Sequence, residues 1–326
     1  MRDDDDAVGL APTQPAALRA APASLRAGVI VNTRSHRNKG EAKARTLEGV
    51  ATAHPTSPAE LDATLSDYAR RGVQLLVVDG GDGTVRDVLT RATRHFTGGM
   101  PKLAVLPSGK TNALALDLGA PRGWTLEAAL AAADLRRTAL RSPLEVWRGS
   151  AAHPELRGFL FGTGAFVRAT QAAQRAHGIG LFDTVAVGAT LASSVARTVF
   201  GRDGEGWRAG DPMRLELDDA PAESAAKFMV MASTLERLPL GARPFGTPRP
   251  GAKLLTVQAP PKRLLAAVPL MLAGRDPAWL EAAGYRRADM DEMRLSIDAD
   301  FVLDGEIYPG GDITLRRGAP LTFVTP

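Results

Sequence analysis

A glycine-rich turn with an embedded acid, Gly80–Thr84, carries the densest chemistry in this sequence. It follows four apolar residues, Leu75–Val78, that predict a buried strand, and it precedes Val85–Arg94, which has the pattern of a helix. Glycines let phosphate oxygens approach the backbone, and helix N-termini favour negative charge. Asp82 adds a carboxylate that could hold a metal ion or accept a proton. A plain strand-to-helix turn is the alternative, but the combination of residues favours nucleotide binding.

Two more polar turns follow predicted strands. Asn32 comes after the apolar run Ala27–Val31, and Ser108–Asn112 comes after the run Lys102–Leu106 and before the predicted helix Ala113–Leu118. This alternation of strands and helices predicts a parallel α/β sheet. Ligands of such sheets bind at the carboxyl ends of the strands. We therefore expect these turns and the glycine-rich turn to share one edge.

Two common phosphate-binding motifs are excluded. Gly109-Lys110-Thr111 resembles the end of a P-loop, but that motif needs a glycine five residues before Gly109, where this chain has Ala104. No G-x-G-x-x-G fingerprint of a dinucleotide-binding fold follows a predicted strand. The nucleotide site is therefore of another kind.

Composition limits the classes of function. The 326 residues have room for two domains, and the chain has no cysteine and five histidines without metal-ligand spacing. The net charge of +4 suits phosphate-bearing substrates or an anionic membrane, but it is too small and dispersed for nucleic acid. The acidic start Asp3–Asp6 is unlike a secretory signal, and Leu181–Phe200 contains charges that make it a poor membrane span.

The chain is expected to have three parts. We interpret residues 1–26 as a disordered tail, 27–140 as a nucleotide-binding α/β domain and 141–326 as a β-rich domain, because short alternating runs dominate after about residue 140. In the first domain, Ser57 and Pro58 predict the start of a helix with Leu61, Leu65 and Tyr68 on its buried face.

A fourth motif, Asp304-Gly305-Glu306, is by itself better explained by a plain hairpin turn. When this motif is combined with Asn32, the glycine-rich turn and Pro107–Ala115, however, the chain resembles the diacylglycerol kinase catalytic family. That family includes bacterial lipid kinases and the sphingosine and ceramide kinases, and its glycine motif is shared with the NAD kinases. The resemblance extends from about Val29 to the C-terminus.

The resemblance implies an α/β fold with an N-terminal parallel-sheet nucleotide-binding domain and a C-terminal β-sandwich-like domain whose last strands pack back on the first. ATP, with Mg²⁺, would bind between them. Asp82 would position Mg²⁺ through the nucleotide or act as a base, and Glu306, backed by Asp304, would take the proton from the lipid hydroxyl. The implied ATP contacts are Asn32, Thr33, Arg34, Ser35, Thr56, Gly80, Gly81, Gly83, Thr84, Val85, Arg86, Ser108, Gly109, Lys110, Thr111 and Asn112.

The chain lacks two acidic residues that are found in many members of the family it resembles. Ala113 stands where many bacterial members have Asp, and Arg141–Leu144 lacks a further expected acid, which puts a structural metal site in doubt. Lys110 replaces a small or hydroxyl residue, and its ammonium could offset phosphate charge. Arg34, His36, Arg37 and Lys39 could meet phosphates or anionic lipids, or form a solvated basic loop.

We therefore predict an ATP-dependent lipid kinase that phosphorylates a hydroxyl of diacylglycerol, a sphingoid base or ceramide. We expect the protein to be cytoplasmic and to bind peripherally at the inner face of the plasma membrane. We expect no nucleic-acid partner, and the sequence is compatible with either a monomer or a homodimer. Leu181–Phe200 is either a wall of the acyl pocket or a core helix. The alternatives are an NAD kinase-like enzyme and a catalytically weak lipid-binding regulatory protein.

Overall fold

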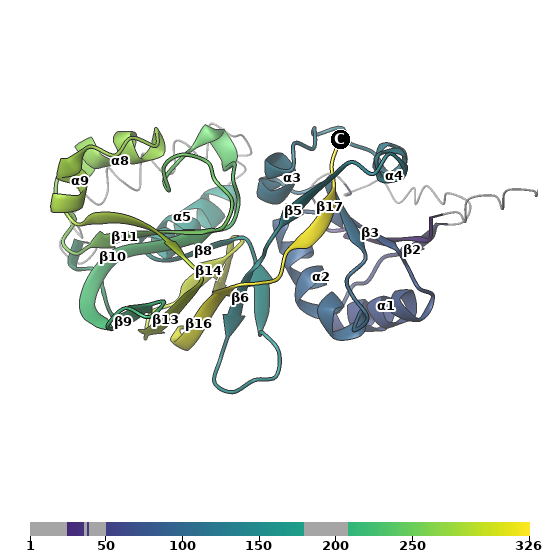
Figure 1. The fold of residues 1–326 in the computed structure, drawn as a ribbon, viewed down its shortest axis with the longest axis horizontal. Helices are drawn as coiled ribbons and strands as arrows, with labels where there is room; N and C mark the ends of the chain where they lie inside the picture. The colour runs from purple at the N-terminus through teal and green to yellow at the C-terminus, as the bar shows by residue number, and fades with distance from the viewer. Residues whose placement is uncertain (1–24, 36–37, 39–49, 179–207) are drawn as a thin grey trace, which may run out of the picture.

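The computed structural model describes residues 25–35, 38, 50–178 and 208–326, and it has two lobes side by side (Figure 1). The predicted tail up to residue 24, the loop cations His36, Arg37 and Lys39, and the stretch Leu181–Phe200 lie outside the described residues. Within the described parts, none of the helices has both the length and the apolarity needed to cross a bilayer.

A six-stranded sheet forms the first lobe, in the order β2-β1-β3-β4-β17-β5. Strands from β2 to β17 run parallel to their neighbours, and β5 is antiparallel to β17. Its strands are β1 (Ala27–Val31), β2 (Ala51–Ala53), β3 (Leu75–Gly80), β4 (Lys102–Pro107), β5 (Thr138–Arg141) and β17 (Leu321–Val324).

Helices cover both faces of this sheet, which explains the continuous apolar run of β3. Leu76 packs with α1 and α2 on one face, and Leu75 packs with α4 on the other. The predicted capping of α1 is confirmed: Ser57 accepts a hydrogen bond from the Glu60 N–H, and Pro58 is the first helical residue. The helices are α1 (Pro58–Arg70), α2 (Asp82–His95), α3 (Ala113–Asp117) and α4 (Leu126–Asp134).

The last strand of the chain belongs to the first sheet. β17 lies between β4 and β5, and its residue Phe323 is fully buried beside Phe159 of the second lobe, with the two ring centroids 6.1 Å apart. The chain therefore crosses between the lobes after β5 and again before β17 (Figure 1). Two covalent connections and a shared core hold the lobes together.

An eleven-stranded antiparallel sheet builds the second lobe. The long strand β10 pairs with β8, β9 and β11, and the sheet folds over so that β8 and β10 pack against β13 and β16 across a common apolar core. The strands are β6 (Leu144–Trp147), β7 (Leu156–Gly158), β8 (Leu160–Gly164), β9 (Asp211–Leu217), β10 (Glu223–Ser233), β11 (Ala252–Gln258), β12 (Tyr285–Met290), β13 (Glu292–Ile297), β14 (Phe301–Leu303), β15 (Glu306–Tyr308) and β16 (Gly311–Arg317).

Short helical segments complete the second lobe. Helix α5 (Ala165–Gly178) follows β8, the 3₁₀ turn η1 (Pro239–Gly241) follows β10, and α8 (Leu264–Leu272) and α9 (Ala278–Ala282) lie between β11 and β12. The predicted fold class is confirmed, because the described chain combines a parallel-rich N-terminal sheet with a large antiparallel C-terminal sheet.

Candidate functional site

The polar turns meet at the carboxyl edge of the first sheet, as the strand order requires. The pairing of β1, β3 and β4 brings their last residues side by side. The backbone N–H of Asn32 donates to the Asp79 carbonyl over 2.9 Å, and that of Ser108 donates to the Gly80 carbonyl over 3.2 Å. The Asn32 side-chain amide also donates to the Thr84 hydroxyl over 2.7 Å. We call the segment at Asn32 the first turn, Gly80–Thr84 the second and Ser108–Asn112 the third. These contacts join the three turns into one continuous surface.

Two glycines touch where the second and third turns cross. A Cβ atom added to Gly109 would lie 2.4 Å from the Cα of Gly81, a distance that real atoms do not tolerate. Gly81 is also the N-cap residue of α2, so a position without a side chain precedes the helix N-terminus. Backbone N–H groups at such an end attract phosphate oxygens. The glycines are thus needed for the close approach of two loops, and they leave the helix end accessible.

The carboxylate of Asp82 ties the glycine-rich turn to α3. It accepts hydrogen bonds from the backbone N–H groups of Ala113 over 3.0 Å and Leu114 over 3.2 Å. Burial raises the pKa of Asp82, although these N–H groups oppose the rise by stabilising its charge. Because the carboxylate caps α3, much of its acceptor capacity is used inside the protein. Asp82 is therefore better suited to interact with a Mg²⁺ ion that is bound to a nucleotide than to form part of a metal site built from several protein side chains.

The third turn is closed by its own asparagine. The Asn112 side chain accepts from the Gly109 N–H and donates to the Gly109 carbonyl, each over 2.8 Å. Asn112 has a positive φ of 52°, a conformation that asparagine tolerates better than most residues. The exposed residues Lys110 and Thr111 lie between Gly109 and Asn112, at the tip of the turn. This rigid ring fixes the segment where the sequence predicts phosphate contacts.

A second, partly buried carboxylate comes from the other lobe. Asp304 lies in the turn between β14 and β15, and it accepts backbone hydrogen bonds from Phe159 over 3.0 Å and Leu160 over 2.9 Å. Burial and the nearby negative charge of Asp82 raise the pKa of Asp304 to about 7. The two acids, 222 residues apart in sequence, are therefore close enough to interact electrostatically.

Arg86 bridges the two lobes beside these acids. Its guanidinium pairs with Asp87 over 2.8 Å, donates to the Leu303 carbonyl over 3.5 Å, and lies over the Tyr308 ring at 5.6 Å from the ring centroid. Only 6% of Arg86 is exposed. The charge of Arg86 offsets part of the rise in the pKa of Asp304. Arg86 thus holds the β14–β15 turn against the first residues of α2.

The remaining predicted residues have different surroundings. Glu306 is exposed at the start of β15, next to the turn that α5 contacts through a hydrogen bond from Gln174 to the Gly305 carbonyl. The Val85 side chain is buried in the core of the first lobe. Thr56 donates from its N–H and hydroxyl to Glu60, which completes the cap of α1. Arg34 donates its N–H to the Asn32 side chain over 2.9 Å, within the first turn.

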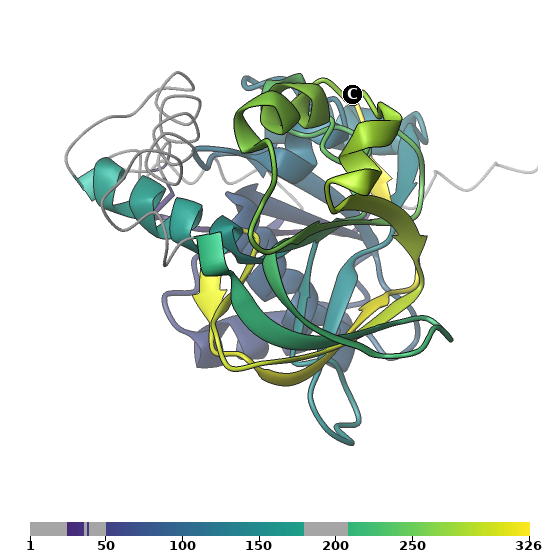
Figure 2. The same ribbon diagram turned by 90° about the vertical axis from the view of Figure 1, so that its left-hand side faces the viewer.

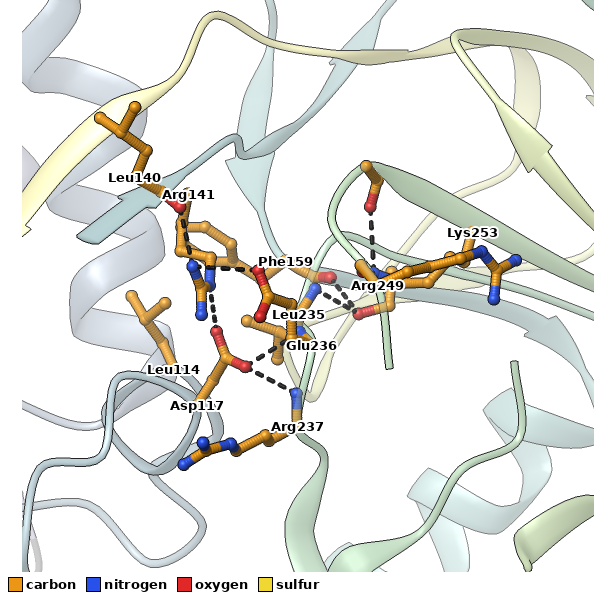
Figure 3. A network of polar contacts seen from close by, with 12 residues as sticks. Leu114, Asp117, Leu140, Arg141, Phe159, Leu235, Glu236, Arg237, Arg249 and Lys253 are labelled. Atoms are coloured by element: carbon orange, nitrogen blue, oxygen red, sulfur yellow. Dashed lines mark hydrogen bonds and ion pairs between the residues drawn. The ribbon is translucent and has the colours of Figure 1, made fainter. Parts of the chain in front are cut away.

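Sequence reasoning missed an ionic network that joins α3 to the second lobe (Figure 3). The Asp117 carboxylate accepts from the backbone N–H groups of Glu236 over 2.9 Å and Arg237 over 2.6 Å, and it pairs with Arg141 over 2.5 Å. Arg141 also pairs with Glu236 over 3.2 Å. Asp117 is only 3% exposed. Its sequence signal is weak, because a single acid at a helix end usually faces solvent.

The described residues contain no ready-made metal site built from protein side chains alone. No cluster of three or more histidine, aspartate or glutamate side chains suited to a metal ion occurs in residues 25–35, 38, 50–178 and 208–326. A cavity of about 450 Å³ lies in the second lobe, between β9, β11, β12 and α9, and none of the predicted site residues lines it. The candidate site is therefore the edge where Asp82, Arg86 and Asp304 meet.

Comparison with known proteins agrees with this geometry. Residues 26–142 match the family model described as the diacylglycerol kinase catalytic domain. Similar solved structures include a diacylglycerol kinase from Bacillus anthracis Sterne, with 13% identity and a TM-score of 0.59. Two proposed diacylglycerol kinases from the same organism share 12% and 16% identity, each with a TM-score of 0.63. All three alignments cover 93% of this chain and 97% of the other. No curated protein matched the sequence.

The raised pKa of Asp304 predicts a pH dependence of stability. Because its pKa lies at about 7, against 3.8 ordinarily, the folded chain binds this proton more tightly than the unfolded chain does. The resulting stabilisation is complete below about pH 4 and is lost as the pH rises to about 7. The free energy of unfolding of the wild type should therefore fall, relative to Asp304→Asn, by up to about 1.4 kcal/mol per pH unit in this range. Urea denaturation at several pH values measures it, and parallel slopes would contradict it.

Proposed function

We propose that this chain, whose residues 26–142 belong to the diacylglycerol kinase catalytic domain family, is an ATP- and Mg²⁺-dependent lipid kinase that phosphorylates a hydroxyl of a membrane lipid. The observation that supports it most is the meeting of two partly buried acids, Asp82 and Asp304, at a glycine-rich helix N-terminus. Phosphoryl transfer needs positioned phosphates, neutralised charge and a carboxylate near the attacking hydroxyl, and this edge supplies groups for each.

The phosphates of ATP are assigned to the N-terminus of α2 and to the ring-closed turn Gly109–Asn112. N–H groups of the helix end bind the phosphate oxygens, and Lys110 offsets their charge from the tip of the turn. Asp82 holds the two loops at the spacing that this requires. Mg²⁺, bound with the nucleotide, would supply neutralisation of the charge that develops on the transferred phosphoryl group.

We assign to Glu306 the role of the base that takes the proton from the acceptor hydroxyl. The carboxylate of Asp304 already accepts hydrogen bonds from two backbone N–H groups, so its acceptor capacity is largely used in holding the turn. Glu306, two residues further along that turn, is exposed and can approach a substrate. Asp304 and Arg86 then position the β14–β15 turn that carries the base.

The acceptor class follows from the family and not from a pocket contact. Diacylglycerol, a sphingoid base and ceramide each offer a hydroxyl on a membrane lipid. We place the reaction at the cytoplasmic face of the plasma membrane. An NAD kinase-like activity and a catalytically weak lipid-binding role are the competing functions, and each predicts a different labelled product.

Phosphate transfer from labelled ATP to a panel of diacylglycerol, sphingosine, ceramide and NAD should label at least one of the lipids. Glu306→Ala should lower kcat by about a hundredfold or more, because a positioned base contributes that much. Glu281→Ala, which removes an exposed glutamate of α9, is the matched control and should retain activity. Labelling of NAD alone would establish the NAD kinase alternative, and labelling of nothing would favour the binding protein.

Lys110→Ala should raise the KM for ATP by about five- to tenfold and leave kcat almost unchanged, because the lost charge contacts phosphate in both ground and transition states. Steady-state kinetics at varied ATP concentration measure the effect. Lys102→Ala, at the opposite end of β4, is the control and should keep the wild-type KM. An unchanged KM in Lys110→Ala would refute the assigned phosphate contact.

A further inference from the structure

Helix α8 is apolar along its whole length, although it lies on the surface of the second lobe. Its sequence, Leu264–Leu272, contains no polar residue. Leu264, Ala267 and Met271 are buried against the core, whereas Leu265 on the opposite side is 52% exposed and Leu272 is 39% exposed. A surface helix normally turns polar residues to water. The exposed apolar side of α8 is therefore unusual for a helix whose only environment is water.

A third exposed leucine comes from the neighbouring turn η1. Leu240 is 54% exposed, and the Arg243 N–H three residues later donates to the Leu272 carbonyl at the end of α8 over 2.8 Å. Arg287 of β12 fixes this arrangement by donating to the carbonyls of Pro244 over 2.8 Å and Arg275 over 2.9 Å. The exposed leucines therefore lie on two segments that are hydrogen-bonded to each other. We call Leu240, Leu265 and Leu272, together with the exposed basic residues Lys262, Arg263 and Arg275, the α8 surface.

Basic residues outnumber acids around these leucines, although Asp276 follows Arg275 directly and pairs with Arg287, and Arg249 pairs with Asp289. Residues 237–251 and 259–275, which contain η1 and α8, have no aspartate or glutamate. Lys262 and Arg263 precede α8, and Arg275 follows it, all exposed. Arg263 also lies over the Trp279 ring, 5.8 Å from its centroid. The basic residues of the two segments are Arg237, Arg243, Arg249, Lys262, Arg263 and Arg275.

We propose that the α8 surface docks this protein onto an anionic lipid bilayer. Leu240, Leu265 and Leu272 enter the boundary between head groups and acyl chains, and Lys262 and Arg263 pair with lipid phosphates. This inference rests on the proposed function, because a lipid kinase must reach its substrate in a bilayer. It identifies a docking surface away from the basic first loop at Arg34.

The occupant that fits the surface best is a bilayer and not a second copy. A stable dimer usually buries about 800 Å² on each partner, with some 20–30 residues a side, which is far more than one nine-residue helix and a turn present. A symmetric pairing would also place the basic rims of both copies together, with like-charge repulsion. An anionic lipid surface matches both the small apolar area and the predominantly basic rim, in which Lys262, Arg263 and Arg275 are exposed.

The orientation of the fold agrees with docking. Helix α8 lies along the upper side of the molecule in Figure 1, and it remains on that side in the turned view of Figure 2. The chain ends on the same side, after β17, which runs parallel to β4. The carboxyl edge of the first sheet, with its polar turns, therefore points toward the side that the bilayer would occupy.

Co-sedimentation of the full chain with vesicles tests the proposal. The wild type should bind vesicles that contain phosphatidylglycerol and should bind pure phosphatidylcholine vesicles much more weakly. Lys262→Glu/Arg263→Glu should lower the partition coefficient by about thirtyfold or more, and Leu265→Ser/Leu272→Ser by about tenfold. The control Arg70→Glu/Arg94→Glu makes the same charge change on α1 and α2, at the lower side of Figure 1, and should bind like the wild type.

Activity toward a detergent-solubilised lipid separates this inference from the proposed kinase. The α8 variants should keep that activity and an unchanged thermal unfolding midpoint. If the wild type binds the vesicles but phosphorylates no lipid, the kinase proposal fails and docking stands. Equal loss of binding in the Arg70→Glu/Arg94→Glu control, undiminished binding in both α8 variants, or a dimer that the leucine variants dissociate would each overturn the docking proposal.

Discussion

One partly buried carboxylate organises the site, because Asp82 caps α3 from the first residue of α2. To reach the N–H groups of Ala113 and Leu114, the glycine-rich turn must lie against the turn Ser108–Asn112. This contact leaves no room for a side chain at Gly109 and little at Gly81. The same carboxylate is near enough to Asp304 to raise its pKa. Loop spacing, helix capping and the electrostatics of the second lobe therefore all depend on the position of one acid.

The lobes are held together by contacts that surround this acid. Arg86 reaches from α2 to the β14–β15 turn, and the Asp117 network joins the other end of α3 to the segment after β10. Removing one member of a buried ion pair typically costs about 3–5 kcal/mol, because the other charge stays buried without compensation. Helix α3 is thus anchored by a carboxylate at each end, one at the nucleotide edge and one at the second lobe.

Local patterns predicted the local structure well. The Ser57–Pro58 start of α1 follows from short-range preferences and occurs in the structure. Strand, glycines and helix follow one another as predicted, but the strand extends through Gly80 and the helix begins at Asp82, three residues before the predicted start at Val85. The return of β17 to the first sheet follows only from the family resemblance, because no local pattern connects Phe323 with Phe159, more than 160 residues earlier. The role of Asp117 was missed for the same reason. Its partners, Arg141 and Glu236, are far away in sequence.

The central claim is that carboxylates from two lobes share one electrostatic site. A titration of the Asp304 carboxyl carbon by ¹³C NMR, in the wild type and in Asp82→Asn, tests this most directly. The wild type should titrate with a midpoint at about 7, and the midpoint should fall in Asp82→Asn because a neighbouring negative charge has been removed. A wild-type midpoint near 3.8, or the same midpoint in both proteins, would contradict the account.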